Sequence, residues 1–380
     1  RDTQQMKEVE GVQVYYRGID PTPIRDFVMK DYNGITRIGK ATVLPGDIVY
    51  GAGGGVYKYA LQESGALEKK AYLPCDKPMF AAADGGKLHI LLRAPFGGQS
   101  FVNPLARAAR GAARPGCEEK CSGYFSCDAD FSGVSEVKST LGECACHIAA
   151  TGGDTYIANY LSGNVVKNCH VCVPHEGAGV NLPRQDMPHT HFAAFSRDKT
   201  RVFCCDLGLD GIFVYDRNLN EISRATVPAG YGVRHLVLTK DGRTVYAVNE
   251  LVPSVTVFAF DGNRLIRKAT ATLPCEEKTS TAAAIRLSAD EKTLYVSVRG
   301  ENVLFALDIS GTHAGANGTP AVLQKVACGG ISPRDFNLFG NYLLCCNETS
   351  DNVVVFSVKE GGAIGERCGE IRLPAPLCVI

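Results

Sequence analysis

The sequence has no tryptophan, no charge excess and no long apolar run, and these absences narrow what the chain can be. Forty basic and forty acidic side chains cancel and form no basic cluster, which argues against nucleic acid or an anionic membrane as a partner. No apolar run approaches the roughly 20 residues that a membrane-spanning helix requires. The first residues, RDTQQMKEVEG, lack the basic-then-apolar order of a secretory signal, so we expect a cytoplasmic protein.

A helical period is also missing, because no 3.6-residue apolar pattern persists over a dozen residues. The chain instead repeats itself between residues 188 and 258, as PHTHFAAFSRDKTRVFCCDLGLDGIFVYD and then GVRHLVLTKDGRTVYAVNELVPSVTVFAF. Aligning Ser196 with Thr239 gives an offset of 43 residues and sets His191 beside Arg234. Each copy holds three short apolar runs joined by tight turns, which is typical of consecutive antiparallel strands.

Copies of this unit account for most of the chain. Seven segments match its opening strand: KPMFAAA, CHIAAT, HFAAFS, RHLVLT, AIRLSA, RDFNLF and APLCVI. The last has no strands after it, so we expect LPAPLCVI to complete the copy that begins near Asp47 with GVYKYAL, and thereby to close a ring. The sequence predicts an all-β, seven-bladed β-propeller over residues 46–380, preceded at 1–45 by an extension or a partial blade. The structural alternatives are an eighth blade at residues 12–44 and a β-helix, whose rungs would be shorter than these repeats.

The kind of propeller is narrowed by the missing tryptophan, since a WD40-type scaffold would carry Trp-Asp strand endings. Sixteen cysteines are present, but Cys204 with Cys205 and Cys345 with Cys346 are adjacent pairs within strands. Adjacent strand residues point to opposite faces, so we expect free thiols in a reducing compartment.

A zinc site is the alternative reading of the cysteines. Plausible ligand spacing exists at Cys169 and Cys172, with His170 and His175 nearby. No matching second pair follows, so we expect no metal and no cofactor.

Four ionisable residues occupy equivalent positions of successive copies. His191 and Arg234 begin the first strand of neighbouring copies, while Glu250 and Arg299 end the second strand of theirs. In antiparallel strands these two positions lie at the same edge of the sheet. The sequence therefore predicts a charged site at one mouth of the central channel, where the loops of a propeller converge.

The segments HEGAGVNLPRQDMPHTH, DLGLDGIFVYD, GVRHLVLTKDGRTVYAVNEL and LPAPLCVI resemble the lactonase family of seven-bladed propellers. That family includes the propeller-type bacterial 6-phosphogluconolactonase and the fungal carboxy-muconate lactonizing enzyme, and the resemblance spans residues 47–380. It implies that Arg234, Glu250 and Arg299 are the active-site arginine, glutamate and arginine. It implies that His189 or His191 is the site histidine, and the repeat alignment favours His191. It also implies that His175 and Arg184 take part in substrate binding.

These residues suit the hydrolysis of a lactone that carries an anionic group. One arginine can hold a carboxylate or phosphate, and the other can stabilise the oxyanion. We expect Glu250 to take a proton from water and the histidine of the PHTH segment to protonate the ring oxygen. No G-x-S-x-G nucleophile motif is present, so direct, metal-independent hydrolysis is expected. Because these residues lie at a rim, we expect their substitution to change thermal stability little.

The resemblance implies a monomeric lactonase acting on 6-phosphogluconolactone in the pentose phosphate pathway. Reversible lactonization of a muconate is a second hypothesis. A non-catalytic propeller that binds a metabolite or protein is a third. The third is favoured by departures from the family pattern at Ala284, where a glutamate is usual, and at Val298 and Glu301, where Asn-Arg-Gly-His is common around Arg299.

Overall fold

The structure, a computed structural model, describes residues 53–95, 120–311 and 318–380, together with four short strands nearer the N-terminus. Those strands form two antiparallel hairpins, β1 (Gln4–Val9) with β2 (Val12–Arg17) and β3 (Met29–Asp31) with β4 (Gly34–Thr36). The described part of this region therefore contains no four-stranded eighth blade. Most of the cysteine-rich insertion at 96–123, and the strand expected at 47–52, lie outside the described residues.

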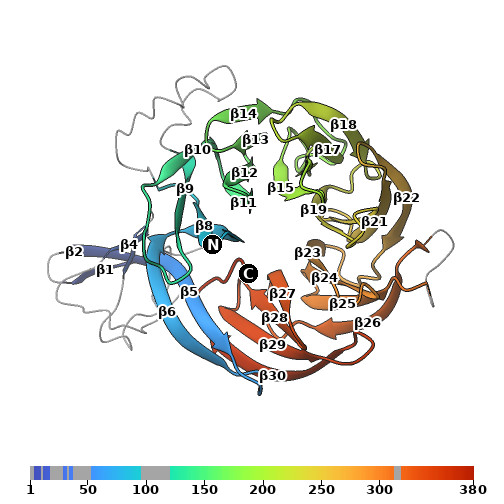
Figure 1. Ribbon diagram of the computed structural model, residues 1–380. Helices are drawn as coiled ribbons and strands as arrows, with labels where there is room; N and C mark the ends of the chain where they lie inside the picture. Colours follow the sequence, from blue (N-terminus) through green and yellow to red (C-terminus); the bar gives the residue numbers. More distant parts are fainter. Residues whose placement is uncertain are drawn as a thin grey trace.

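Six four-stranded antiparallel sheets stand around a central channel, as Figure 1 shows. In chain order they are β7 (Pro78–Asp84), β8 (Lys87–Leu92), β9 (Cys121–Asp128) and β10 (Lys138–Glu143); β11 (Ala145–Thr151), β12 (Asp154–Asn159), β13 (Asn164–Lys167) and β14 (Val171–Pro174); β15 (Thr190–Phe195), β16 (Arg201–Asp206), β17 (Gly211–Asp216) and β18 (Glu221–Thr226); β19 (Val233–Leu238), β20 (Thr244–Asn249), β21 (Ser254–Phe260) and β22 (Leu265–Thr272); β23 (Thr281–Leu287), β24 (Thr293–Arg299), β25 (Val303–Asp308) and β26 (Ala321–Ala327); and β27 (Pro333–Phe339), β28 (Tyr342–Asn347), β29 (Asn352–Val358) and β30 (Ile364–Arg372). In each sheet the first strand lies next to the channel.

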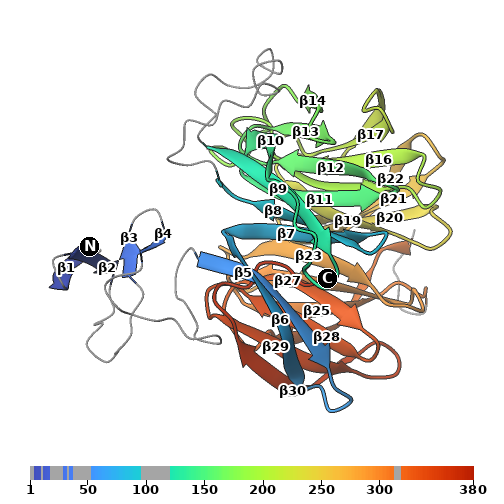
Figure 2. The same cartoon turned by 60° about the vertical axis from the view of Figure 1, so that its left-hand side comes forward.

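The seventh blade contains β5 (Gly53–Leu61) paired with β6 (Leu67–Asp76), between the β7–β10 and β27–β30 sheets (Figure 2). The all-β, seven-bladed prediction is confirmed. The expectation that LPAPLCVI pairs as the innermost strand of this blade is wrong for the described residues, because 373–380 form no strand ladder. The segment still runs to the channel, where Val379 N–H donates to Asp335 Oδ2 at 3.1 Å and Asn337 Nδ2 donates to Val379 O at 3.3 Å. Side-chain bonds to the neighbouring blade thus replace the strand pairing.

The sequence repeat has a direct structural counterpart in the first hairpin of each copy. The strands β15 and β16 recur as β19 and β20 at the predicted offset. Their turns share one hydrogen bond, which Ser196 Oγ donates to Asp198 Oδ1 and Thr239 Oγ1 donates to Asp241 Oδ1, both at 2.6 Å. Each turn also needs a positive φ, supplied by Lys199 in one copy and by Gly242 in the other.

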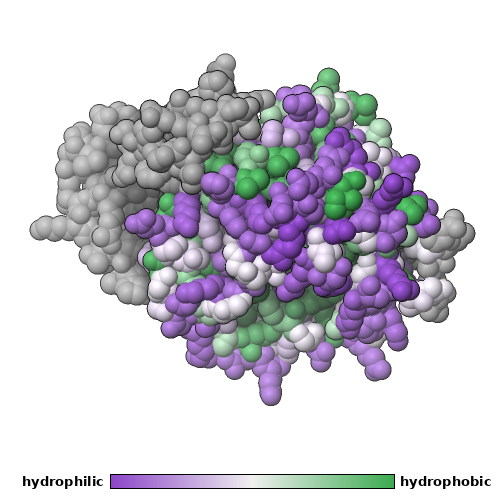
Figure 3. Space-filling view, turned by 45° about the horizontal axis from the view of Figure 1, so that its top comes forward, coloured by the Kyte–Doolittle hydropathy of each residue, from purple (hydrophilic) through white to green (hydrophobic). Residues whose placement is uncertain are grey.

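The hydrophobic core lies between neighbouring blades. Alternate residues of a central strand pack on opposite sides, so Cys204 contacts the preceding blade and Cys205 the following one. Cys345 and Cys346 are divided in the same way, and all four are free thiols. Figure 3 shows a face on which hydrophilic side chains predominate and hydrophobic ones form small separate patches. Within the described residues, no helix is long and apolar enough to cross a bilayer.

Candidate active site

A β-bulge at the start of the channel-side strand re-aims one side chain in each four-stranded blade. In β15 the ladder skips His191 between Thr190 and Phe192, and in β19 it skips Arg234 between Val233 and His235. Bulges commonly lie next to functional sites because they redirect a side chain out of the regular alternation. The residues at this position, which we call the bulge ring, are Met79, Cys146, His191, Arg234, Ala283 and Arg334.

A second set of equivalent residues follows or ends the next strand of each blade. Glu250 N–H donates to Gly232 O, two residues before the bulge residue of the same blade, and Glu348 N–H donates to Ser332 O in the same way. This strand-end ring comprises Arg93, Tyr160, Leu207, Glu250, Arg299 and Glu348. The first and last positions of this hairpin lie at the same edge of each sheet, so the two rings lie at one mouth of the channel.

Glu250 is the centre of an ion-pair cluster at this mouth. Its Oε2 lies 2.9 Å from Arg234 Nε and 3.1 Å from Arg299 Nη2, and its Oε1 lies 2.6 Å from Arg184 Nη2. The contact with Arg234 has the distance but not the angle of a hydrogen bond. The structure thus brings together four of the predicted site residues, one of them from the loop before β15.

The charges in this cluster shape one another. Burial opposes the charge on Glu250, but the guanidinium groups, Arg299 and Arg234 foremost, outweigh it and hold the pKa of the carboxyl well below its usual range. Burial lowers the pKa of Arg234 to about 9, assisted by Arg299 and opposed by Glu250, so this guanidinium remains charged at neutral pH. Both carboxylate oxygens of Glu250 already face guanidinium groups, and this geometry does not favour the expected role of Glu250 as the base.

The position of Arg184 is fixed by a buried glutamine in its loop. Gln185 Nε2 donates to Leu207 O and to Asp210 Oδ1, both at 2.8 Å. Asp210 in turn accepts from the N–H groups of Gly230 and Gly232, directly before β19. The loop is therefore tied to the segment that delivers Arg234, and a buried, satisfied network of this kind rigidifies a site.

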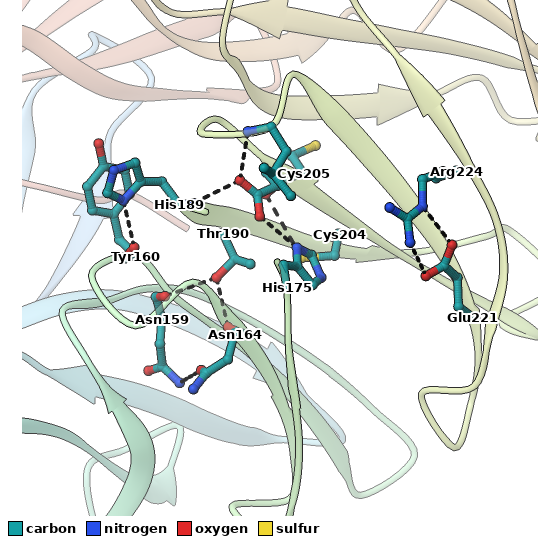
Figure 4. Close-up of polar contacts among 12 residues, drawn as sticks. Asn159, Tyr160, Asn164, His175, His189, Thr190, Cys204, Cys205, Glu221 and Arg224 are labelled. Atoms are coloured by element: carbon teal, nitrogen blue, oxygen red, sulfur yellow. Dashed lines mark hydrogen bonds and ion pairs between the residues drawn. The ribbon is translucent and has the colours of Figure 1, made fainter. Parts of the chain in front are cut away.

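The two histidines of the PHTH segment differ in their surroundings. His189 stacks on Tyr160 at 4.4 Å between ring centroids, and its Nδ1 lies 3.0 Å from Tyr160 O, as seen in Figure 4. Its Nε2 lies 3.4 Å from Asp186 Oδ1. His191 is equally buried, but its Nδ1 has no partner among the described residues. Of the two, His191 is the one with a ring nitrogen that makes no hydrogen bond to any described residue.

The pKa of His191 is also displaced. Burial, followed by the nearby Arg234 charge, holds it well below its usual range, while Glu250 acts in the opposite sense. The ring is therefore neutral at neutral pH. A neutral imidazole with an unpaired nitrogen near a carboxylate can accept a proton and be stabilised once charged.

The prediction that His175 contacts the substrate is not supported by its geometry. Its Nδ1 lies 2.6 Å from Asp206 Oδ2 and its Nε2 lies 2.7 Å from Tyr215 OH, so both ring nitrogens are occupied inside the blade. The ring also stacks on Phe213 at 3.8 Å. Figure 4 shows His175 apart from the Tyr160 and His189 pair. His175 secures the blade under the site and is not brought into the ion-pair cluster.

Three residues at the mouth were not selected from the sequence. Tyr160 belongs to the strand-end ring and is one of the groups that raise the pKa of Arg184, after Glu250. Arg334 Nη1 donates to Glu348 Oε2 at 3.2 Å, two blades beyond Arg234 and Glu250. A signal for the second pair was present: VRHL followed by VNE recurs as PRDF followed by CNE.

Two expectations change because the cluster is buried. The side chains of Arg234 and Glu250 are only 3% and 6% exposed, so in place of the expected small change we now expect their substitution to lower thermal stability. Ala284 and Val298 are fully buried and pack in the cores between blades. At these two departures from the family pattern, the side chains therefore fill the interior between blades. They give little support to the hypothesis that catalysis at the mouth has been lost.

Within the described ranges, no group of three His, Cys, Asp or Glu side chains could hold a metal ion. Cys169 is buried in an apolar cluster, and burial raises the pKa of its thiol to about 12. That environment suits an unligated cysteine.

The fold and this charged mouth define a catalytic type of β-propeller with chemistry from several blades. The chain belongs to the family described as lactonase, seven-bladed beta-propeller, whose model matches residues 124–380. It is 27% identical over 263 residues to a 6-phosphogluconolactonase of Bacillus subtilis, covering 63% of this chain and 73% of that one. It is 32% identical over 281 residues to an uncharacterized Lactococcus lactis protein, covering 66% and 80%.

A solved structure, the periplasmic gluconolactonase of Pseudomonas aeruginosa, shares the fold with a TM-score of 0.70. The two chains are 22% identical, and the match covers 87% of this chain and 96% of that one.

Proposed function

We propose that this protein hydrolyses a sugar lactone, with 6-phosphogluconolactone as the substrate and 6-phosphogluconate as the product. The observation that carries the proposal is the cluster in which Arg234, Arg299 and Arg184 surround Glu250 near His191, whose Nδ1 is buried and unpaired among the described residues. Membership of the lactonase family and the Bacillus subtilis relative named 6-phosphogluconolactonase support it. The proposal places the product in the pentose phosphate pathway.

The mechanism assigns the first proton transfer to His191. The neutral imidazole takes a proton from water as the water oxygen attacks the lactone carbonyl carbon. The negative charge that develops on the carbonyl oxygen is stabilised by Arg299, which is partly exposed, with Arg234 behind it. Glu250 holds both arginines and stabilises the imidazolium that forms.

The second step opens the ring. The tetrahedral intermediate collapses, the bond from the carbonyl carbon to the ring oxygen breaks, and the ring oxygen takes the proton from the His191 imidazolium. The product carboxylic acid then loses its proton to water. No covalent enzyme intermediate forms, and His191 ends neutral as it began.

Lactone loss at constant pH, corrected for spontaneous hydrolysis, tests the proposal. Purified protein should accelerate the loss of 6-phosphogluconolactone with saturable kinetics. A rate equal to that of the His191→Asn variant, or to that of buffer alone, would contradict it. Incubation with a carboxy-muconate should give no lactone, and formation of one would favour the cycloisomerase instead.

We include in the proposal a cytoplasmic, monomeric protein. The four adjacent cysteines of the blade cores are free thiols, as a reducing compartment requires. Thiol titration of denatured protein without reductant should find most of the sixteen cysteines free. Six or more disulfides would overturn the assignment, and sedimentation should report the mass of one chain.

A further inference from the structure

The two-ring geometry repeats one arrangement of side chains at two places on the mouth. Arg234 and Glu250 occupy the bulge ring and the strand-end ring of the blade β19–β22. Arg334 and Glu348 occupy the same two positions of the blade β27–β30, two blades further round. The intervening blade β23–β26 supplies Ala283 at the bulge position and Arg299 at the strand-end position, so within the bulge ring a small side chain separates Arg234 from Arg334.

Arg334 differs from Arg234 in how many of its guanidinium donors already have a partner. Arg234 Nη1 donates to Ala283 O at 2.7 Å and to His235 Nε2 at 3.1 Å, and its Nε faces Glu250. Within the described part of the chain, the partner recorded for the Arg334 guanidinium is Glu348, through Nη1. The Arg334 side chain is 23% exposed, against 3% for Arg234. An arginine with open donors in a partly desolvated mouth suits an oxyanion ligand.

Arg334 also acts electrostatically across the mouth. Its charge lowers the pKa values of His191 and Arg234, and it interacts with Cys146 on the blade β11–β14. The Arg334 pKa is itself raised by Glu348 and, more weakly, by Glu250, against the effect of burial. Arg334 therefore lies close enough to the cluster around Glu250 to interact with it electrostatically, although no ion pair joins them.

We infer that Arg334 binds the phosphate of the substrate while the cluster around Glu250 acts on the lactone carbonyl. In a 6-phosphorylated δ-lactone the carbonyl carbon and the carbon that bears the exocyclic phosphate arm flank the ring oxygen, so the carbonyl and the phosphate leave the ring from two different carbons. Two cationic positions in one mouth, separated by the small Ala283, match that division. The inference rests on the proposed function and specifies which part of the substrate each pair of residues takes.

The test compares a phosphorylated with a neutral lactone. Arg334→Ala should raise KM for 6-phosphogluconolactone about 10- to 100-fold, because charge-assisted hydrogen bonds are lost. The loss in kcat/KM should be smaller for unphosphorylated glucono-δ-lactone, which has no phosphate for Arg334 to bind, and Arg334→Lys should recover part of the loss on the phosphorylated lactone. The control is Arg224→Ala, which removes a surface pair with Glu221 on the outer strand β18 (Figure 4). Equal losses on both lactones in Arg334→Ala would overturn the inference.

A binding measurement separates this inference from the proposed function. Calorimetric titration with 6-phosphogluconate should give a Kd that weakens about 10- to 100-fold in Arg334→Ala but not in Arg224→Ala. If wild type hydrolyses neither lactone yet shows this difference, the proposed function fails and the phosphate site stands. If wild type and Arg334→Ala bind 6-phosphogluconate equally, the inference fails whatever the activity.

Discussion

The two arginine–glutamate pairs of the mouth occupy the same positions of their blades but stand in different surroundings. Glu250 is buried and contacts three arginines, whereas the Glu348 side chain is 31% exposed and contacts Arg334. The scaffold supplies the same backbone geometry in both blades. What differs is the number of neighbouring charges and the extent of desolvation, which suggests that one geometry serves charge stabilisation in the first pair and ligand recognition in the second.

The largest expected effect, on stability and activity together, comes from removing the charge of Glu250. Glu250→Gln leaves buried guanidinium groups uncompensated, so we expect the free energy of unfolding to fall by about 3–5 kcal/mol. The same change removes the group that aligns Arg234 and Arg299, and kcat should fall by about 10²-fold or more. Urea unfolding and lactone kinetics measure the two effects. If Glu250→Gln is as stable and as active as wild type, the distinction between the two arginine–glutamate pairs is wrong.

His191 comes next, because it belongs to the bulge ring beside Arg234. His191→Asn should lower kcat by about 10²- to 10⁴-fold with KM within a few-fold, as expected for the loss of a proton-transfer group. His189→Asn is the matched control, since both nitrogens of that ring already have partners. Its effect on kcat should stay below about tenfold. A larger effect in His189→Asn than in His191→Asn would reverse the assignment.

The pH dependence of stability should report the buried histidines behind the Glu250 cluster. Burial holds the pKa values of His147, His191 and His235 well below the usual range, so all three are neutral in the folded protein. Below about pH 6.5 the unfolded chain binds protons at these three residues, whereas in the folded protein the same residues stay neutral. Stability from this source is complete above that pH and should be lost as the pH falls below it.

Urea midpoints between about pH 7.5 and 5 would measure this loss, and His235→Phe should flatten the curve. By the same reasoning kcat/KM should show no inflection near pH 6.5, because His191 is already neutral there. An inflection at that pH which disappears in His191→Asn would show that the histidine is charged in the free enzyme.

Much of the blade architecture could be predicted from the sequence, because strand alternation and turn residues recur at a fixed offset. The convergence of His191, Arg234, Glu250 and Arg299 followed from the same repeat. The environment of each residue could not be predicted from the repeat, since burial and ion pairing depend on side chains from other blades. His175 therefore gave no sign that Asp206 and Tyr215 occupy both of its nitrogens.

The path of the C-terminal segment also could not be predicted from the sequence repeat. An apolar run predicts an innermost strand, but the observed segment is held instead by bonds between Val379 and the side chains of Asp335 and Asn337. Asp335 is itself paired with Arg286 from the neighbouring blade at 2.8 Å. Val379, Asp335 and Arg286 are far apart in the sequence, so no local sequence pattern predicts the contact among them.

The smallest expected effect concerns Glu348, and it sharpens the comparison with Glu250. A pair that is partly exposed contributes little to stability, so Glu348→Gln should change the free energy of unfolding by less than about 1 kcal/mol. The substitution keeps the side-chain shape but removes the charge that competes with a ligand for Arg334. Affinity for 6-phosphogluconate should therefore rise a few-fold in Glu348→Gln, whereas it should not rise in Glu250→Gln, where the aligned arginines lose their anchor. Calorimetric titration of the two variants under one salt concentration measures the difference. A loss of affinity in Glu348→Gln equal to that in Glu250→Gln would mean that both glutamates only hold arginines in place, and the two pairs would then be alike in function as well as in position.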